Sequence, residues 1–334
     1  MRAEVSEESR IAPLRSRQIT SLPPMREAEL CRHATRQLSG RVSETGLIHL
    51  VRAVNNASAV AARVSKDDPP KMPELRFAAA TRHFAQPVRQ AIDTAASIGA
   101  TGVQFDVRNE LKPSELSETG RRHLIRQLGE QRLELASFEY PTRRALHDAE
   151  SLDARIAGLK GALEFAYSMG VPVVVGRVGR IPDDPELPAY KLLCDVLNDI
   201  ARHSNRVGAT FAITPSSDSV EGLRGLFERV TGGPIGLNLD PAGLIMSGGN
   251  PVETYRTLYD RVLSVQIRDG LRDVDGQGVE VPVGRGEVVW DELLAMLEEG
   301  SFRGWLVATR SSGDDKAGDM ARAIRYVRAV TAGE

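Results

Sequence analysis

From Leu75 onward, short apolar or β-branched runs alternate with longer stretches whose apolar residues recur at helical spacing. A helix-like stretch follows each run, as PVRQAIDTAASIG follows the first and PAYKLLCDVLNDIARHSN the fourth. Eight runs can be counted: LRFAAA from Leu75, GVQFDV from Gly102, LELASFEY from Leu133, VPVVVGRV from Val171, ATFAIT from Ala209, IGLNLD from Ile235, LSVQIRD from Leu263 and GWLVAT from Gly304. This alternation is typical of a parallel sheet built from βα units.

Eight βα units over about 260 residues match the size of a (β/α)₈ barrel. An open doubly wound sheet is the alternative, but six strands would complete it, and no GxGxxG motif follows the first run. The sequence therefore predicts an α/β fold, a (β/α)₈ TIM barrel, over residues 72–334.

Residues 1–71 differ from the rest of the chain. The first 70 contain no Phe, Trp or Tyr, and they carry eleven Arg or Lys against eight Asp or Glu. Such a segment cannot pack an aromatic core, although residues 46–65 have helical apolar spacing. We expect a mostly disordered or partly helical N-terminal extension before the barrel, with Met72 as an alternative translation start.

Composition limits the classes of partner and site that the chain can have. The chain of 334 residues has a net charge of −2, so it lacks the basic excess that binds nucleic acid. Cys31 and Cys194 are too isolated for a disulfide framework or a structural zinc site. Arginines and prolines interrupt the first thirty residues, and no apolar run reaches membrane-spanning length. We expect a cytoplasmic protein without membrane or nucleic-acid partners, and a homo-oligomer remains open.

Four segments resemble the xylose isomerase-like TIM barrels, a family that includes sugar and sugar-phosphate isomerases and epimerases and endonuclease IV. The segments are IGATGVQFD, GLNLDPAGLIMSGGNPVE, VQIRDG and VPVGRGEVVWDELLAMLEEGSFRGWLVAT. The resemblance covers Leu75 to about Val330. It implies a divalent metal held by glutamates ending strands 5 and 8, an aspartate ending strand 6 and a histidine on strand 7. The metal polarises substrate oxygens while the glutamates move a proton.

The resemblance places one retained ligand, the strand 6 aspartate, on Asp240. The other three ligand positions carry neutral side chains: Thr214, Gln266 and Thr309. A substrate-contacting histidine of several relatives falls on Gly243, and a strand 2 glutamate falls on Gln104. One carboxylate with three neutral partners holds Mg²⁺ or Mn²⁺ poorly, and threonine does not titrate near neutrality. We expect no firmly bound cofactor and a metal-dependent proton transfer that is lost or altered.

The positions of the histidines exclude one class of metal site. None of the six lies beyond His203, so the later strands supply no histidine for a zinc cluster of the endonuclease IV type. His83, just after the first run, is placed where it could face a pocket. The alternative is a solvated loop histidine.

The remaining polar residues at the run ends are the candidates for chemistry, because strand C-termini form the active face of such barrels. They are Asp106, Glu139, Arg177, Asp240, Arg268, Asp269 and Arg310. If Gln266 points inward, strand alternation turns Arg268 inward too. By the same alternation, Arg310 turns away from Thr309 toward a helix or the rim.

Two interpretations follow. Asp240 and Arg268 could form a buried ion pair in place of the metal. Alternatively, Arg177, Arg268 and Arg310 could bind an anionic small molecule such as a sugar phosphate or sugar acid. Further substrate-binding candidates are Gln104, Asp106, Thr214, Gln266, Asp269 and Thr309. GRGE from Gly284 and GGN from Gly248 are expected to form turns.

Three hypotheses about function remain. The first is a diverged barrel, a pseudoenzyme with respect to the metal-dependent reaction, that keeps a pocket for a polar or anionic small molecule. The second is an active isomerase, epimerase or lyase on a carbohydrate, with Glu139 or Asp240 as base. The third is a non-catalytic interaction module that recruits a partner through the N-terminal extension.

Overall fold

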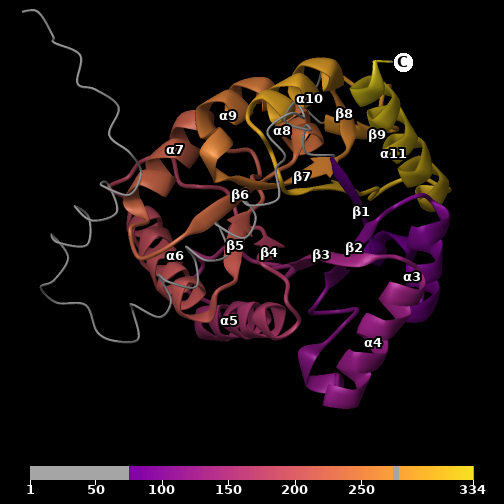
Figure 1. The fold of residues 1–334 in the computed structure, drawn as a ribbon. Coiled ribbons are helices and arrows are strands. Elements are labelled where there is room, and N and C mark those ends of the chain that lie inside the picture. Colours follow the sequence, from indigo (N-terminus) through magenta and orange to yellow (C-terminus); the bar gives the residue numbers. More distant parts are fainter. Residues whose placement is uncertain (1–74, 274–277, 334) are drawn as a thin grey trace, which may run out of the picture. The chain divides into compact units, whose positions relative to one another are not determined.

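Eight parallel strands close a barrel in the part of the chain that the computed structural model describes, residues 75–273 and 278–333 (Figure 1). Around the barrel the order is β1, β2, β3, β4, β5, β6, β7 and β10. The strands are β1 (Arg76–Ala80), β2 (Gly102–Asp106), β3 (Glu134–Glu139), β4 (Val173–Gly176), β5 (Thr210–Ile213), β6 (Ile235–Leu239), β7 (Val262–Ile267) and β10 (Trp305–Ala308). Seven of them lie within the predicted runs and β7 begins one residue before its run, which confirms the barrel. The prediction for residues 1–71 falls outside the described residues.

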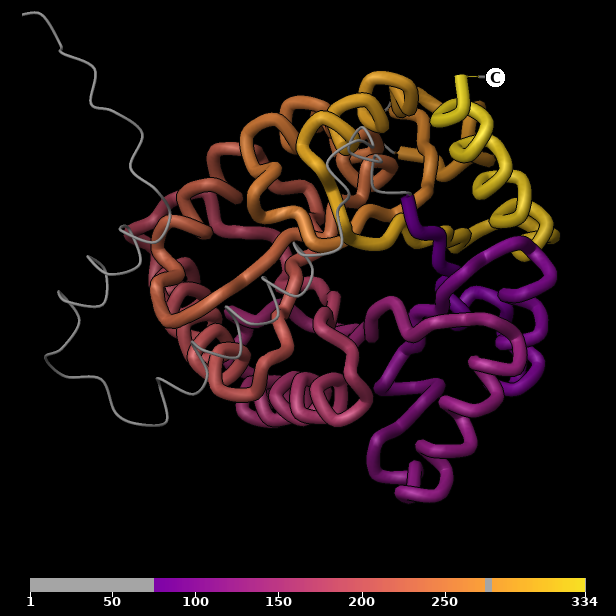
Figure 2. The backbone as a smooth tube through the Cα atoms, in the orientation of Figure 1, coloured from indigo at the N-terminus to yellow at the C-terminus, as the bar shows by residue number. Residues whose placement is uncertain are grey.

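Helices surround the strands, as the backbone trace shows (Figure 2). They are α3 (Val88–Ser97), α4 (Glu118–Glu130), α5 (Leu152–Ser168), α6 (Pro188–Val207), α7 (Val220–Arg229), α8 (Pro241–Ser247), α9 (Pro251–Leu258), α10 (Trp290–Glu299) and α11 (Lys316–Ala332). Short 3₁₀ turns lie at η1 (Thr81–Phe84), η2 (Pro113–Glu115) and η3 (Tyr259–Arg261). No helix in the described ranges is long and apolar enough to cross a membrane.

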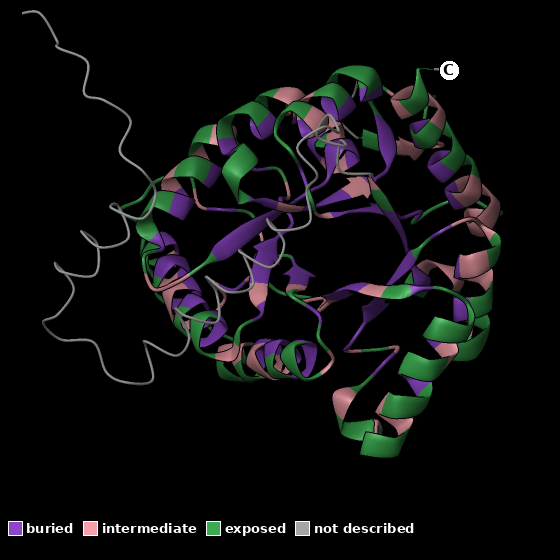
Figure 3. Cartoon of the chain, viewed as in Figure 1, coloured by how far each residue is buried: buried purple, intermediate pink, exposed green. Residues whose placement is uncertain are grey.

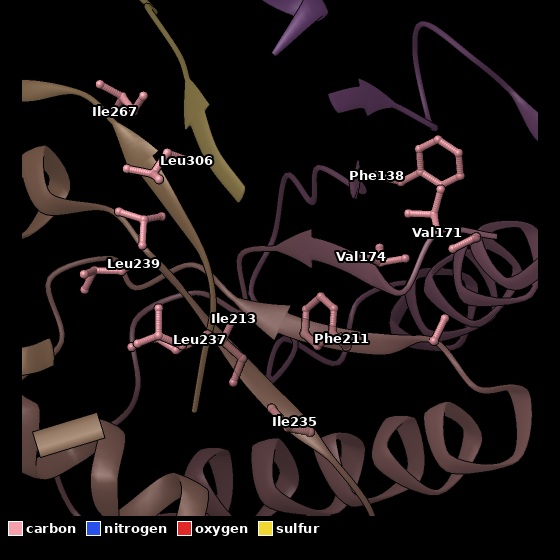
Figure 4. Packing of buried hydrophobic residues seen from close by; sticks show 14 of the residues in the cluster. Phe138, Val171, Val174, Phe211, Ile213, Ile235, Leu237, Leu239, Ile267 and Leu306 are labelled. Atoms are coloured by element: carbon pink, nitrogen blue, oxygen red, sulfur yellow. The ribbon is translucent and has the colours of Figure 1, made fainter. Parts of the chain in front are cut away.

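Alternate residues of the strands build a continuous apolar layer between sheet and helices (Figures 3 and 4). Phe138, Phe211 and Leu306 belong to this layer and are essentially inaccessible to solvent. Burying each such side chain contributes about 1.5–3 kcal/mol. Because strand residues alternate between faces, the positions between them point into the barrel, where several polar side chains gather.

The GGN segment forms the predicted turn. Gly248 ends α8 with a φ of 85°, a conformation that glycine adopts without strain. Asn250 then caps α9 by accepting hydrogen bonds from the backbone N–H groups of Val252 and Glu253. Two helices thus follow β6 in place of one.

A two-stranded antiparallel hairpin follows β7 and was not predicted. Its strands are β8 (Asp269–Arg272) and β9 (Gly278–Val281). A side chain at Gly278 would come within 2.1 Å of Cβ of Met246, so the hairpin lies close against α8. This position brings Glu280 to the C-terminal end of the barrel strands, where it contacts Arg268.

Candidate functional site

A cavity of about 180 Å³ lies at the C-terminal ends of the strands. This is the end of a (β/α)₈ barrel at which chemistry takes place. It is lined by Arg82, His83, Glu139, Pro141, Thr142, Gly176, Arg177, Thr214, Gln266, Arg268, Thr309 and Ser311. Six of the residues predicted for the site therefore lie together here: Glu139, Arg177, Thr214, Gln266, Arg268 and Thr309.

An ion pair closes one side of the cavity. Asp240 directly follows β6, and its Oδ1 caps α8 by accepting the Gly243 N–H at 3.0 Å. Its Oδ2 lies 2.6 Å from a terminal nitrogen of Arg268. Asp240 is fully buried and Arg268 is 9% exposed. The predicted buried pair is thus confirmed, and Arg268 points inward together with Gln266.

Glu280 of the hairpin completes the surroundings of Arg268. Its Oε1 accepts from Arg268 Nε at 3.1 Å, and its Oε2 accepts the Ser311 N–H at 3.0 Å. Burial would lower the pKa of Arg268, but Asp240 and Glu280 together hold that pKa above its ordinary value. Burial raises the pKa of Glu280. The charge of Arg268 and the hydrogen bond from the Ser311 N–H outweigh this effect and keep that pKa below its ordinary range. Arg268 is therefore a permanent cation between two carboxylates.

Sequence reasoning missed Glu280 because it missed the hairpin. A usable signal was Asp275-Gly276, a turn-forming pair, followed by alternating Val279 and Val281. Arg82 was also missed. It lies in the short turn η1, and the sequence contains no pattern that singles it out.

The residues around Asp240 do not fit the divalent metal that the fold suggests. Thr214, Gln266 and Thr309 offer neutral oxygens, and the one carboxylate among the four positions already contacts the guanidinium of Arg268. A divalent cation bound to Asp240 would lie against that guanidinium, and the two positive charges would repel each other. Within residues 75–273 and 278–333, no three His, Cys, Asp or Glu side chains are placed to hold a metal.

Glu139 and His83 bring titratable groups to the cavity. Glu139, at the end of β3, is ion-paired with Arg82. Burial raises the pKa of Glu139, and the charge of Arg82 opposes that rise. Burial, with the nearby charges of Arg82 and Arg268, lowers the pKa of His83 to about 3. The cavity thus holds a carboxyl group with a raised pKa and an imidazole that is neutral at pH 7.

Gln104 and Asp106 of β2 do not line the cavity. The Gln104 side chain lies within the barrel and donates to Ser137 Oγ at 2.7 Å. Asp106 accepts from the backbone N–H groups of Arg108 and Asn109 at 2.8 and 2.9 Å, and so caps the loop that follows β2.

Asp269 does not line the cavity, because its carboxylate accepts hydrogen bonds from the GRGE loop. Its fully buried carboxylate accepts the Gly284, Gly286 and Val288 N–H groups at 2.9, 3.2 and 3.2 Å. A side chain at Gly286 would come within 2.0 Å of Asp269 Oδ1. The loop forms a turn as predicted, and its second glycine permits this close approach.

Arg310 is turned away from Thr309, as strand alternation predicted. Its Nε donates to Asp319 of α11 at 2.9 Å, and its terminal nitrogen lies 3.8 Å from Glu280. Arg310 does not line the cavity. It links the end of β10 to the last helix.

Comparisons with known proteins agree with the barrel fold. The family model described as "Xylose isomerase-like TIM barrel" matches residues 92–330. A comparison with curated proteins found no match. Among solved structures, a xylose isomerase domain protein from Planctomyces limnophilus is similar with a TM-score of 0.66 and 23% identity, over 72% of this chain and 92% of that one.

Two further structures share the fold. A xylose isomerase-like TIM barrel protein from Mycobacterium smegmatis, in complex with magnesium, has a TM-score of 0.61 and 16% identity, over 73% of this chain and 88% of that one. The 3-keto-D-glucoside 4-epimerase from E. coli has a TM-score of 0.60 and 14% identity, over 77% of this chain and 99% of that one.

Proposed function

Because the chain belongs to the xylose isomerase-like TIM barrel family, we propose that its barrel binds a small anionic carbohydrate without a divalent metal. The observation that carries the proposal is the 2.6 Å contact between Arg268 and Asp240. A guanidinium lies where the retained carboxylate of the family would hold a cation. The Arg268 side chain therefore supplies the positive charge at this end of the barrel, and Asp240 and Glu280 balance it.

The donors that line the cavity favour an anion. Arg177 lines it with a side chain that is 49% exposed, and its contacts with the Asp240 carboxylate and the Pro215 carbonyl are long, at 3.5 and 3.4 Å. Its guanidinium can turn a two-pronged face to a carboxylate, a geometry that lysine does not offer. Thr214, Gln266 and Thr309 add hydroxyl and amide groups that match sugar hydroxyls.

Calorimetric titration with sugar acids and with neutral aldoses of the same size tests this proposal. We expect aldonates or uronates to bind, neutral aldoses to bind at least about tenfold more weakly, and EDTA to change neither affinity. Arg177→Gln should weaken sugar-acid binding by about tenfold or more, since it removes the exposed guanidinium. Equal binding of neutral sugars, or loss of binding in EDTA, would contradict the proposal.

The control variant is Arg256→Gln. Arg256 lies on α9 with a 67% exposed side chain, 3.6 Å from Glu292. The variant removes the same charge from α9, a helix none of whose residues lines the cavity, and should leave the affinity for sugar acids unchanged.

A second candidate function is a metal-independent isomerase, epimerase or lyase with Glu139 as base. It is favoured by the position of Glu139 on the cavity and by burial, which raises the pKa of this carboxyl group toward the range of a useful base. Asp240 is the weaker candidate because both of its oxygens are engaged, by the Gly243 N–H and by Arg268.

For this candidate, Glu139→Gln should abolish turnover of the sugar acid that binds. Turnover should rise with pH through the pKa of Glu139, because the base acts when deprotonated. Arg82→Gln should move this rise to higher pH, since the charge of Arg82 lowers that pKa. A turnover that survives Glu139→Gln would exclude Glu139 as the base.

A further inference from the structure

A second cavity, of about 230 Å³, lies beside the loop that joins β3 to α5. It is lined by Arg108, Tyr140, Arg143, Arg144, Ser151, Ala154 and Arg155. Four of these seven residues are arginines, and none is acidic. The cavity differs in this from the first one, whose lining includes Glu139.

Two of the four arginines are already engaged. Arg144 is paired with Asp148 and with Glu150, each at 2.9 Å. Arg155 is 7% exposed and donates its terminal nitrogens to the backbone carbonyls of Asp148 and Glu150. These two side chains hold the acidic stretch 148–150, whose residues do not line the cavity.

The other two arginines keep free donors. The side chain of Arg108 makes one hydrogen bond, to the Pro141 carbonyl at 2.9 Å, and its guanidinium lies over the Tyr140 ring at 5.6 Å. Arg143 is exposed and makes no ion pair or hydrogen bond with any residue of the described ranges. Neither guanidinium therefore has a carboxylate partner there.

The start of α5 adds backbone N–H donors. This helix is 17 residues long, and its N-cap residue, Ser151, makes no side-chain capping bond. The Leu152 N–H donates to the Ala149 carbonyl at 3.3 Å, and Asp153 places a carboxylate in this turn. The N–H groups of Asp153 and Ala154 are those left to an anion, and the helix dipole favours negative charge there. Ser151 and Ala154 of this turn both line the cavity.

We propose that this second cavity is a binding site for a phosphoryl group. A carboxylate has two oxygens, which one guanidinium can engage in full. Two unpaired guanidinium groups and a helix N-terminus offer more donors than that, and they match the several oxygens and double charge of a phosphate. The proposal does not depend on the proposed function of the first cavity.

The two cavities are neighbours along the chain, which leaves two sources for the phosphoryl group. Tyr140 lines the second cavity and Pro141 lines the first. The group could therefore be free phosphate, or the phosphate of a sugar whose remaining part reaches the first cavity. Both sources share the same recognition chemistry, and they can be separated by experiment.

Calorimetric titration of the full chain with inorganic phosphate, and separately with a hexose 6-phosphate, tests the site. We expect at least one of them to bind, and Arg108→Gln/Arg143→Gln to weaken that binding by about tenfold or more. If Arg177→Gln weakens hexose phosphate binding, the two cavities serve one substrate; if it does not, the phosphoryl site acts alone.

The control for lost charge is Arg202→Gln/Arg256→Gln, which changes two exposed arginines on α6 and α9. Circular dichroism checks that the single variant Arg143→Gln is folded. We expect an unchanged spectrum, because the Arg143 side chain makes no ion pair or hydrogen bond in the described ranges. The proposal is overturned if neither phosphate compound binds the unmodified chain at millimolar concentration. It is equally overturned if Arg143→Gln and the double variant bind as tightly as that chain.

Discussion

Arg268 and Asp240 are two charges that the fold removes from water. Removal of each ion costs several kcal/mol, and the cost is recovered only when the geometry is good and the remaining polar atoms are satisfied. Here the pair is 2.6 Å apart, Glu280 accepts from Arg268 Nε, and the Gly243 N–H donates to Asp240. The group is thus stable as a whole and sensitive to the loss of any one member.

Arg268→Gln should lower the free energy of unfolding by about 3–5 kcal/mol, because it leaves Asp240 and Glu280 buried without their cation. Urea denaturation measures the change. The control Arg256→Gln, at an exposed pair with a separation of 3.6 Å, should cost less than about 1 kcal/mol.

The neutral double variant Asp240→Asn/Arg268→Gln separates charge from packing. It should be more stable than the sum of the two single changes predicts, since Arg268→Gln alone leaves Asp240 without its cation and the double variant does not. Additive losses, or an Arg268→Gln protein as stable as Arg256→Gln, would show that the pair is not a stabilising unit.

At the scale of elements, the β8–β9 hairpin and the GRGE loop position the groups around Arg268. Asp269, at the start of β8, accepts three backbone N–H groups from the loop. Glu280, on β9, contacts both Arg268 and the residues after β10. The loop therefore fixes the hairpin, and the hairpin fixes the carboxylate that neutralises the cavity wall.

Gly286→Ala should destabilise the protein by about 2–4 kcal/mol, because the added methyl group would meet Asp269 Oδ1 at 2.0 Å and the Gly270 carbonyl at 2.6 Å. Thermal unfolding measures the loss, and hydrogen exchange should rise in 278–288. Gly129→Ala is the matched control. This residue lies in α4 with open space around it, so the change should stabilise by about 0.5–1 kcal/mol. Equal effects of the two changes would contradict the role given to the loop.

At the scale of the whole molecule, the fold was predictable because the pattern repeats. Eight apolar runs, each followed by a helical stretch, leave few ways to cover a parallel sheet on its outer face. Strand ends gather at one face of such a barrel, and the family resemblance carried its ligand positions onto Thr214, Gln266 and Thr309, so these residues could be placed together.

Other parts of the site depend on contacts that no local pattern encodes. Arg82 and Glu280 reach the cavity from a short turn and from a hairpin inserted after β7. Asp106 ends β2 and Asp269 begins β8, two residues after β7 ends, and the carboxylates of both accept backbone N–H groups of nearby loops. Strand ends thus identify candidates, and loop geometry decides which of them face the cavity.

Titration of the full chain with Mn²⁺, followed by electron paramagnetic resonance, asks most directly whether Arg268 has replaced the metal. We expect no saturable one-to-one binding at micromolar Mn²⁺, with or without a bound sugar acid, because the retained carboxylate is already paired with a guanidinium. Stoichiometric binding at micromolar or lower Mn²⁺ that disappears in Asp240→Asn would contradict this expectation and restore Asp240 as a metal ligand.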